Sequence, residues 1–275
     1  MNTVAQSVAV SEGKAGSAIG RNLRLTAWQV LYEQRGFWRN RRRAMFSFAF
    51  PLMFLFIFGA LNHGHISSRG NISYIDFYVP GIIAYAVMVI GFSNMAMAIA
   101  LLKDKGILKR MRTTPMPTGA YLAGITLSTV ITILAAICLL LAVGAGLFGA
   151  QVRLSTLPGL LASCVLGIVC FTTLGIAASR LIGNPDGGMP ILMFITLPLS
   201  FISNVFFPLE GVPGWLNSLA KFFPLRPLAD GLQAAFDHRT HGAGFVGHDL
   251  STLAIWAVVG CYAMLKTVRA LSEKD

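Results

Sequence analysis

The sequence predicts an all-α integral membrane protein with six transmembrane helices, and three observations lead to this prediction. Hydrophobic residues make up 55% of the 275 residues, and the mean hydropathy is +0.67. Charged residues make up 12%, about half of the roughly 25% found in soluble proteins. The apolar residues are gathered into runs that are long enough to cross a hydrocarbon core of about 30 Å.

The N-terminal region is expected to stay outside the membrane core. Residues 1–20 are rich in Ser, Gly, Ala and Val without a helical stripe, which predicts a disordered cytoplasmic tail and not a signal peptide. Residues 21–275 are expected to form a single transmembrane domain. At its start, segment 21–38 has apolar residues at helical spacing, arginines on the opposite side of that helix and several aromatic residues. It is too polar to span, so an amphipathic helix lying flat on the membrane surface is expected in preference to an ordinary soluble helix.

Six apolar runs follow, each expected to be one transmembrane helix. The first comes after the arginine cluster 39–43 and contains Pro51, a candidate kink. Residues 183–188, of sequence GNPDGG, predict a turn before the fifth run. The expected spans are residues 44–61, 78–102, 121–148, 157–181, 189–208 and 250–265.

The segment before the last span differs in kind, because it is rich in proline and aromatic residues. Its two apolar patches, 212–223 and 228–236, are too short to cross a membrane. Short re-entrant helices that dip into one leaflet are expected here, since irregular backbone at that depth must be shielded by protein.

The basic residues fix the expected orientation. With the N-terminus inside, the inner segments hold 17 of the 22 Lys and Arg residues and the outer segments hold 5. By the positive-inside rule both termini are cytoplasmic. The net charge of +11 is therefore attributed to the ends of the spans and to lipid headgroups, and not to nucleic-acid binding.

Several kinds of chemistry have no recognisable residues in this chain. There is no GxxxxGK[ST] motif, no HExxH motif and no CxxC pair, so no catalytic residue, metal site or bound cofactor is expected. His63 and His65 are read as part of a solvated loop. The spans contain almost no ionisable side chains, so an ion-coupled transporter would lack its carriers. An intramembrane enzyme is disfavoured because no nucleophile–base pair is visible.

The stretch 103–117, KDKGILKRMRTTPMP, is called the coupling segment below. Its five basic residues are what any cytoplasmic loop would show. However, Ile107, Leu108 and Met111 fall on one helical face, with Gly106 before them and Pro115 at the end. A helix with an apolar face favours docking into a partner protein.

The coupling segment, together with FPLRPLADGL at 223–232 and NVFFP at 204–208, resembles the type-2 permeases of ATP-binding-cassette exporters. Within them the resemblance is to the daunorubicin-resistance-like bacterial drug efflux group, and it covers most of the chain after Arg21. One departure is Lys105, where the family often has Glu, which leaves Asp104 as the sole acid of the loop. The surface of the partner ATPase would then differ in charge.

The resemblance implies a permease subunit of a bacterial plasma membrane that is not itself an enzyme. It would pair with a second copy or a paralogue and with two separate cytoplasmic ATPase subunits, which bind the ATP and Mg. The surface helix at 21–38 would form part of the ATPase contact. The residues implied in that coupling are Lys103, Asp104, Lys105, Gly106, Ile107, Leu108, Lys109, Arg110, Met111, Arg112 and Pro115.

The expected substrate is hydrophobic or amphipathic, either a drug or antibiotic or a lipid-like molecule, moved out of the cell. Candidates for the path are Phe92, Asn94, Met95, Phe201, Asn204 and Phe206, for which lipid-facing packing is the plain alternative. The re-entrant element is marked by Pro224, Arg226, Pro227 and Asp230. Two alternatives stay open: export of a polysaccharide or lipid-linked glycan, and a non-transporting membrane scaffold or immunity protein.

Overall fold

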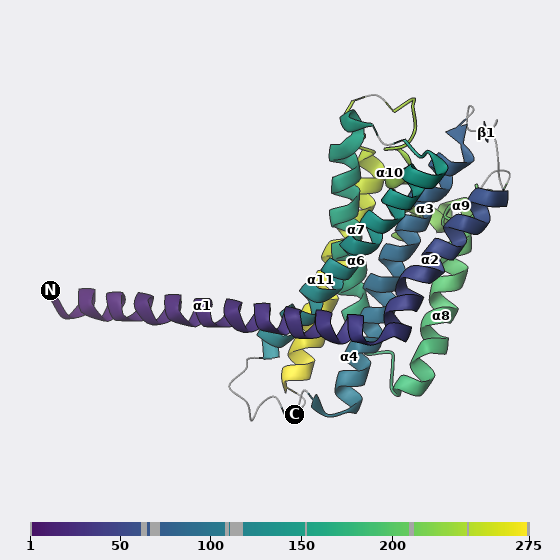
Figure 1. Ribbon diagram of the computed structural model, residues 1–275. Coiled ribbons are helices and arrows are strands. Elements are labelled where there is room, and N and C mark those ends of the chain that lie inside the picture. Colours follow the sequence, from purple (N-terminus) through teal and green to yellow (C-terminus); the bar gives the residue numbers. More distant parts are fainter. Residues whose placement is uncertain are drawn as a thin grey trace.

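The structure is a computed structural model that describes residues 2–61, 65–66, 72–107, 110, 118–151, 153–208, 212–240 and 242–273. The described chain is a bundle of helices that stand side by side, crossed near one end by a long first helix (Figure 1). Its two short strands, β1 (His65–Ile66) and β2 (Ile72–Ser73), pair antiparallel.

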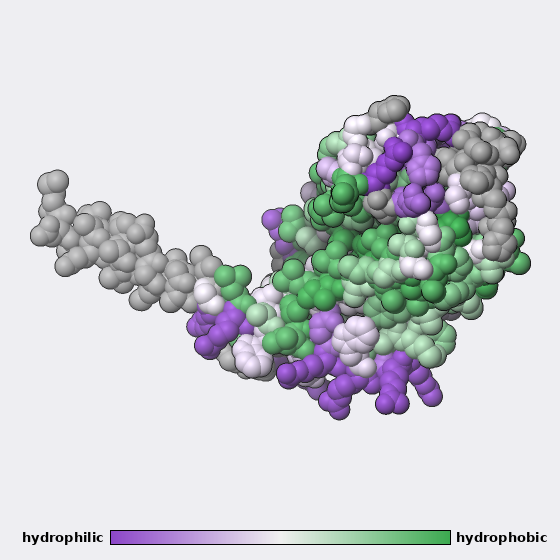
Figure 2. Space-filling view, turned by 45° about the horizontal axis from the view of Figure 1, so that its top comes forward, coloured by the Kyte–Doolittle hydropathy of each residue, from purple (hydrophilic) through white to green (hydrophobic). Residues whose placement is uncertain are grey.

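Within the described residues, six helices are long and apolar enough to cross a membrane, which confirms the predicted fold class. The second is one continuous rod with a π-helical centre, and a 3-10 turn, η3 (Leu154–Thr156), precedes the fourth. Figure 2 shows a hydrophobic band between hydrophilic side chains at the two ends of the bundle. The six are α2 (Arg41–Leu61), α3–η2–α4 (Tyr74–Met88, Val89–Asn94, Met95–Asp104), α6 (Thr118–Phe148), α7 (Leu157–Ala178), α8 (Pro185–Ile202) and α11 (Gly247–Glu273).

Helix α1 (Asn2–Arg39) lies across the bundle at the end where α4 and the C-terminus lie, called the inner end below (Figure 1). Gln34 fixes it to α6, because its Nε2 donates to the carbonyl O of Ser128 at 2.7 Å. Leu23 and Trp28 are 66% and 62% exposed, as expected of a helix at the membrane surface. The helix begins at Asn2, in place of the disordered tail expected for residues 1–20, a stretch without proline.

Helix α7 is the most closely surrounded of these spans apart from α3–η2–α4, with 61% of its apolar window buried. Glycines allow its neighbours to approach closely. A Cβ on Gly175 would lie 2.4 Å from the carbonyl O of Gly91 in η2, and a Cβ on Gly260 of α11 would lie 2.4 Å from Thr173 Oγ1. Larger residues at these positions would force the helices apart.

Helix α8 begins earlier and ends earlier than residues 189–208. Its N-terminus lies inside the expected turn because Asn184 caps it: Asn184 Oδ1 accepts a hydrogen bond from the backbone N of Asp186 at 3.1 Å, and Pro185 takes the first helical position. The helix stops at Ile202 because Asn204 has a φ of +61°, a left-handed conformation that α-helix cannot continue.

Two short helices occupy the region between α8 and α11, at the opposite, outer end of the bundle (Figure 1). They are α9 (Gly214–Phe222) and α10 (Leu225–Gln233). Helix α10 packs against α3, α7 and α11, and eight of its nine residues are buried. The prediction of short helices before the last span is confirmed.

Candidate functional site

The coupling segment begins with a sharp change of direction at the inner end. Helix α4 ends at Asp104, and Gly106 has a φ of +61°, which glycine adopts without strain. The backbone N of Gly106 donates to Lys103 O at 3.0 Å, and the backbone N of Arg110 donates to Gly106 O at 3.1 Å. The second bond has helical spacing, so a new turn of helix starts at the glycine.

The residues of this turn differ in exposure. Asp104, Lys105 and Arg110 are exposed, whereas Gly106 and Ile107 are partly covered. The structure therefore presents both charges of the Asp104–Lys105 pair at the surface of the inner end. Outside the described residues lie Leu108, Lys109, Met111, Arg112 and Pro115.

Lys103 points into the protein and not toward the surface. Its Nζ donates to the carbonyl O and to Oγ of Ser179, at 3.0 and 3.1 Å. Ser179 is fully buried and follows the last residue of α7. Lysine thereby satisfies a carbonyl at a helix C-terminus, where a cation is also favoured by the helix dipole.

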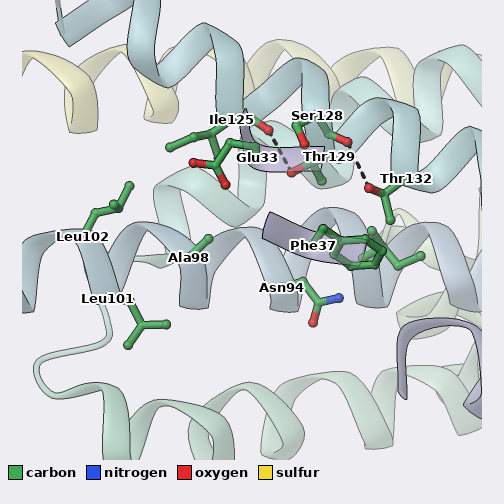
Figure 3. Close-up of a pocket in the computed structure, with 11 residues that line it drawn as sticks. Glu33, Phe37, Asn94, Ala98, Leu101, Leu102, Ile125, Ser128, Thr129 and Thr132 are labelled. Atoms are coloured by element: carbon green, nitrogen blue, oxygen red, sulfur yellow. Dashed lines mark hydrogen bonds between the residues drawn. The ribbon is translucent and has the colours of Figure 1, made fainter. Parts of the chain in front are cut away.

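A pocket of about 170 Å³ lies between α1, the η2–α4 rod and α6. Figure 3 shows the side chains that these elements supply, among them Glu33 and Phe37 of α1 and Asn94 of η2. Asn94 also donates from Nδ2 to Ser47 Oγ of α2 at 3.3 Å. The wall combines a carboxylate, hydroxyls and an amide with leucine and isoleucine side chains, a mixture suited to an amphipathic group.

The other path candidates of the second span lie in packed surroundings. Met95 is 1% exposed and belongs to a hydrophobic cluster with Ile99 and Ile125, and its sulfur accepts a hydrogen bond from Thr129 Oγ1 at 3.5 Å. Phe92 is partly buried against the core. Of the three second-span candidates, Asn94 is the one that lines this pocket.

The candidates of the fifth span differ in exposure, although the rings of Phe201 and Phe206 are in contact, 5.8 Å apart between centroids. Phe201 is 51% exposed on α8, whereas Phe206 is 3% exposed. The Phe206 ring lies 4.8 Å from that of Phe54 and 5.2 Å from that of Tyr85, between centroids. Asn204 is fully buried in a polar network. The structure thus brings the two aromatic candidates together, whereas the side chain of Asn204 binds α10.

The polar network joins the end of α8 to α10. Asn204 Nδ2 donates to Asp230 Oδ1 at 2.7 Å and to Gln233 Oε1 at 3.2 Å. Gln233 Nε2 returns a bond to Asn204 O at 3.0 Å. Arg226 completes the group through its Nε, 3.3 Å from Asp230 Oδ2. Each bond satisfies a polar group that would be costly to bury alone.

Two of the four residues predicted to mark the re-entrant element, Arg226 and Asp230, are thus members of this network. The other two are Pro224, which precedes α10, and Pro227 in its first turn, where a missing N–H costs nothing. Sequence reasoning missed Gln233. Its signal was an amide side chain that accompanies Asp230 inside the largely apolar patch 228–236.

A second pocket, of about 390 Å³, opens beside this network at the outer end. Its wall carries the carboxylates Asp76, Asp230, Asp237 and Asp249, together with Lys221 and Arg226. Asp76 Oδ2 lies 3.9 Å from Nε2 of His238. The outer end therefore presents a pocket of mixed charge beside the apolar part of the bundle.

Comparison with known proteins identifies the family. Residues 26–236 match the family described as "ABC-2 type transporter". The chain is 29% identical to the daunorubicin resistance ABC transporter permease protein DrrB1 of Streptomyces coeruleorubidus over 233 residues, which are 82% of this chain and 78% of that protein. It is 24% identical to the inner membrane transport permease YadH of Escherichia coli K12 over 184 residues, 67% and 71% of the two chains. The chain is a multi-pass membrane protein and belongs to the ABC-2 type transporter family.

Proposed function

We propose that the chain is the transmembrane subunit of an ATP-binding-cassette exporter, driven by a separate ATPase. The observation that carries this proposal is the turn at the inner end, where Gly106 redirects the chain and leaves Asp104, Lys105 and Arg110 exposed between two spans. An exposed, charged turn on the cytoplasmic side of a permease is a surface to which a motor protein can attach. Membership of the ABC-2 family supports this reading.

Helix α1 extends the proposed ATPase surface. It crosses the same end of the bundle, and Arg21, Arg24 and Arg35 on it are exposed. Hydrogen bonds from Thr26 and Gln34 to α6 hold it in place. A partner protein that contacts both α1 and the coupling segment would bind the transmembrane bundle at two points.

The proposal includes a dimer, formed with a second copy or with a paralogue. Helices α2 and α8 are only 28% and 22% buried in their apolar windows. They carry large exposed aromatic side chains, among them Phe46 at 66% and Phe194 at 82% exposure. These apolar faces suit contact with lipid or with a second subunit.

The substrate class we propose is a hydrophobic or amphipathic molecule, a drug or a lipid. The pocket at Glu33 and Asn94 supports it, because it offers polar groups beside an apolar wall at the inner end. The similar protein DrrB1 is named for daunorubicin resistance, which favours a drug over a lipid as the substrate. Export of a lipid-linked glycan or polysaccharide, and a role as a scaffold or immunity protein, are the competing outcomes of the test below.

The test begins with a search of the neighbouring reading frames for an ATP-binding-cassette ATPase, with which the full chain is then reconstituted. In proteoliposomes we expect ATP hydrolysis to rise on assembly, and ATP to drive movement of ethidium or of a fluorescently labelled phosphatidylethanolamine. Movement of a labelled lipid-linked glycan alone would replace the substrate class. Stable assembly without movement of any of these probes would point to a scaffold, and failure to assemble or to stimulate hydrolysis would contradict the proposal.

A further inference from the structure

Lys103 stands at the point where the second span passes into the coupling segment. Its ammonium group is half-buried and holds both oxygens of Ser179. Ser179 Oγ in turn donates to Ile176 O at 2.7 Å, within the last turn of α7. Two hydrogen bonds from Lys103 therefore attach the end of α4 to the end of α7, and the third lies within α7. The charged donor makes the attachment stronger than one between neutral groups.

The second span also meets α7 one helical turn before Ser179. Gly175 of α7 faces the π-helical turn η2, where a Cβ on it would lie 2.4 Å from Gly91 O and 2.8 Å from Phe92 O. A contact between backbones this close leaves no side-chain layer in which one helix could slide past the other. The second span and α7 are thus in contact at two neighbouring points, one turn apart along α7.

The outer end of α7 is attached to the region around α10. Thr156, fully buried just before α7, donates from Oγ1 to Ala235 O at 2.8 Å, close to the end of α10. The backbone N of Gly159 donates to Ala243 O at 2.9 Å, and a Cβ on Gly159 would lie 2.2 Å from Gly244 O. Ala235, just after α10, and Ala243, just before α11, are therefore both bound to the start of α7.

These attachments place α7 between the proposed motor surface and the outer pocket. We infer that Lys103 and Ser179 form a latch through which movement of the coupling segment is passed to α7, and from α7 to α10 and the polar network of Asn204. This inference rests on the proposed function. It gives Lys103 a positioning role inside the permease, distinct from direct contact with the ATPase.

The substitutions that test the latch follow from its chemistry. Lys103→Met keeps the length and apolar stem of the side chain and removes its donors, whereas Lys103→Arg keeps the charge and the donors. Ser179→Ala removes one acceptor and leaves the carbonyl. Lys105→Met is the matched control, since it makes the same chemical change on the exposed side of the same turn.

The measurement compares three quantities for each variant in proteoliposomes with the partner ATPase. They are the amount of ATPase that copurifies, the rate of ATP hydrolysis and the amount of ethidium or labelled phosphatidylethanolamine moved per ATP. For Lys103→Met we expect assembly and hydrolysis near wild type and transport per ATP lowered about tenfold, within the range of typical coupling free energies. Lys103→Arg should restore most of it, and Ser179→Ala should lie between.

Lys105→Met is expected to differ in kind, with less ATPase copurified and transport per ATP unchanged. If Lys103→Met behaved like Lys105→Met, Lys103 would be a docking residue and the latch would be wrong. Unaltered transport per ATP in both Lys103→Met and Ser179→Ala would also overturn it. If Lys103→Met did not insert, Ser179→Ala and Lys103→Arg would still decide the question. A wild-type chain that neither stimulates the ATPase nor moves a probe would instead refute the proposed function.

The outer attachment gives an independent arm of the experiment. Thr156→Val removes the hydroxyl that binds Ala235 O while keeping the shape of the side chain, and it should lower transport per ATP in the same way. Because both changes interrupt one connection, the double variant with Lys103→Met should lose little more than the more severe single variant. Losses that multiply would show that the two ends of α7 act separately.

Discussion

Asn204 combines a left-handed backbone, with a φ of +61°, and a side chain that is fully buried. Asparagine is one of the few residues other than glycine that adopts this conformation readily. Its amide also donates to both Asp230 and Gln233. One residue therefore ends α8 and binds that end to α10, which explains why the fifth span stops at Ile202.

We expect Asn204→Ala to lower the free energy of unfolding by about 2–4 kcal/mol, since alanine is strained at positive φ and leaves buried acceptors without their donor. Asn204→Gly is the control: glycine keeps the backbone conformation without strain and loses only the side-chain bonds. Its loss should be smaller by about 1 kcal/mol. Unfolding in mixed micelles with increasing sodium dodecyl sulfate measures both. A stability of Asn204→Ala equal to that of wild type would show that the network does not hold the two helices together.

The elements could be predicted from the sequence to different degrees. The spans could be predicted directly, because a basic cluster such as 39–43 and the uncharged run after it mark a membrane boundary along the sequence itself. The short helices before the last span followed from the lengths of their apolar patches. The π-helical turn Val89–Asn94 did not, because it lies where Gly91 meets Gly175, a residue far away in the sequence.

The sites were less accessible than the elements for the same reason. Lys103 and Ser179 are 76 positions apart, and no sequence motif near either residue indicates that they are in contact. A lysine beside a cytoplasmic loop looks like any positive-inside residue, so the sequence alone predicts the same docking role for Lys103 as for Lys105. Only the packed fold distinguishes the side chain that turns inward from the one that stays exposed.

At the level of the coupling segment, the turn geometry at Gly106 is itself testable. A Cβ at this position would meet no atom within 4 Å, so only the φ of +61° restricts the residue. We expect Gly106→Val to misdirect the segment and to lower ATPase stimulation several-fold, because a β-branched residue is strongly disfavoured at positive φ. Gly106→Asn, which tolerates this conformation, should retain most of the stimulation. Equal stimulation by both variants would show that the direction of the turn is unimportant, and membrane insertion should be unchanged in each.

For the whole molecule, the helices place the proposed ATPase-binding surface and the mixed-charge pocket at opposite ends of the bundle. Residues 103–107 at the start of the coupling segment, α1 and the C-terminal end of α11 share one end of the bundle, and α9 and α10 share the other (Figure 1). The mixed-charge pocket lies at this second end, lined by residues of α10 and its neighbours. The hydrophobic band between the two ends is seen in Figure 2. An exporter of this design would take energy at one end and open toward solvent at the other, with α7 running between them.

This order predicts which surfaces face the cytoplasm, and it can be tested in intact cells. We expect Cys introduced by Lys105→Cys to react with a membrane-impermeant maleimide only after permeabilisation, and Cys introduced by Ser218→Cys on α9 to react from outside. Both positions are exposed in the structure. The native cysteines lie within the spans, so the wild-type chain gives the background. Labelling of the Lys105→Cys variant from outside would invert the topology, and with it the surface at which an ATPase can bind.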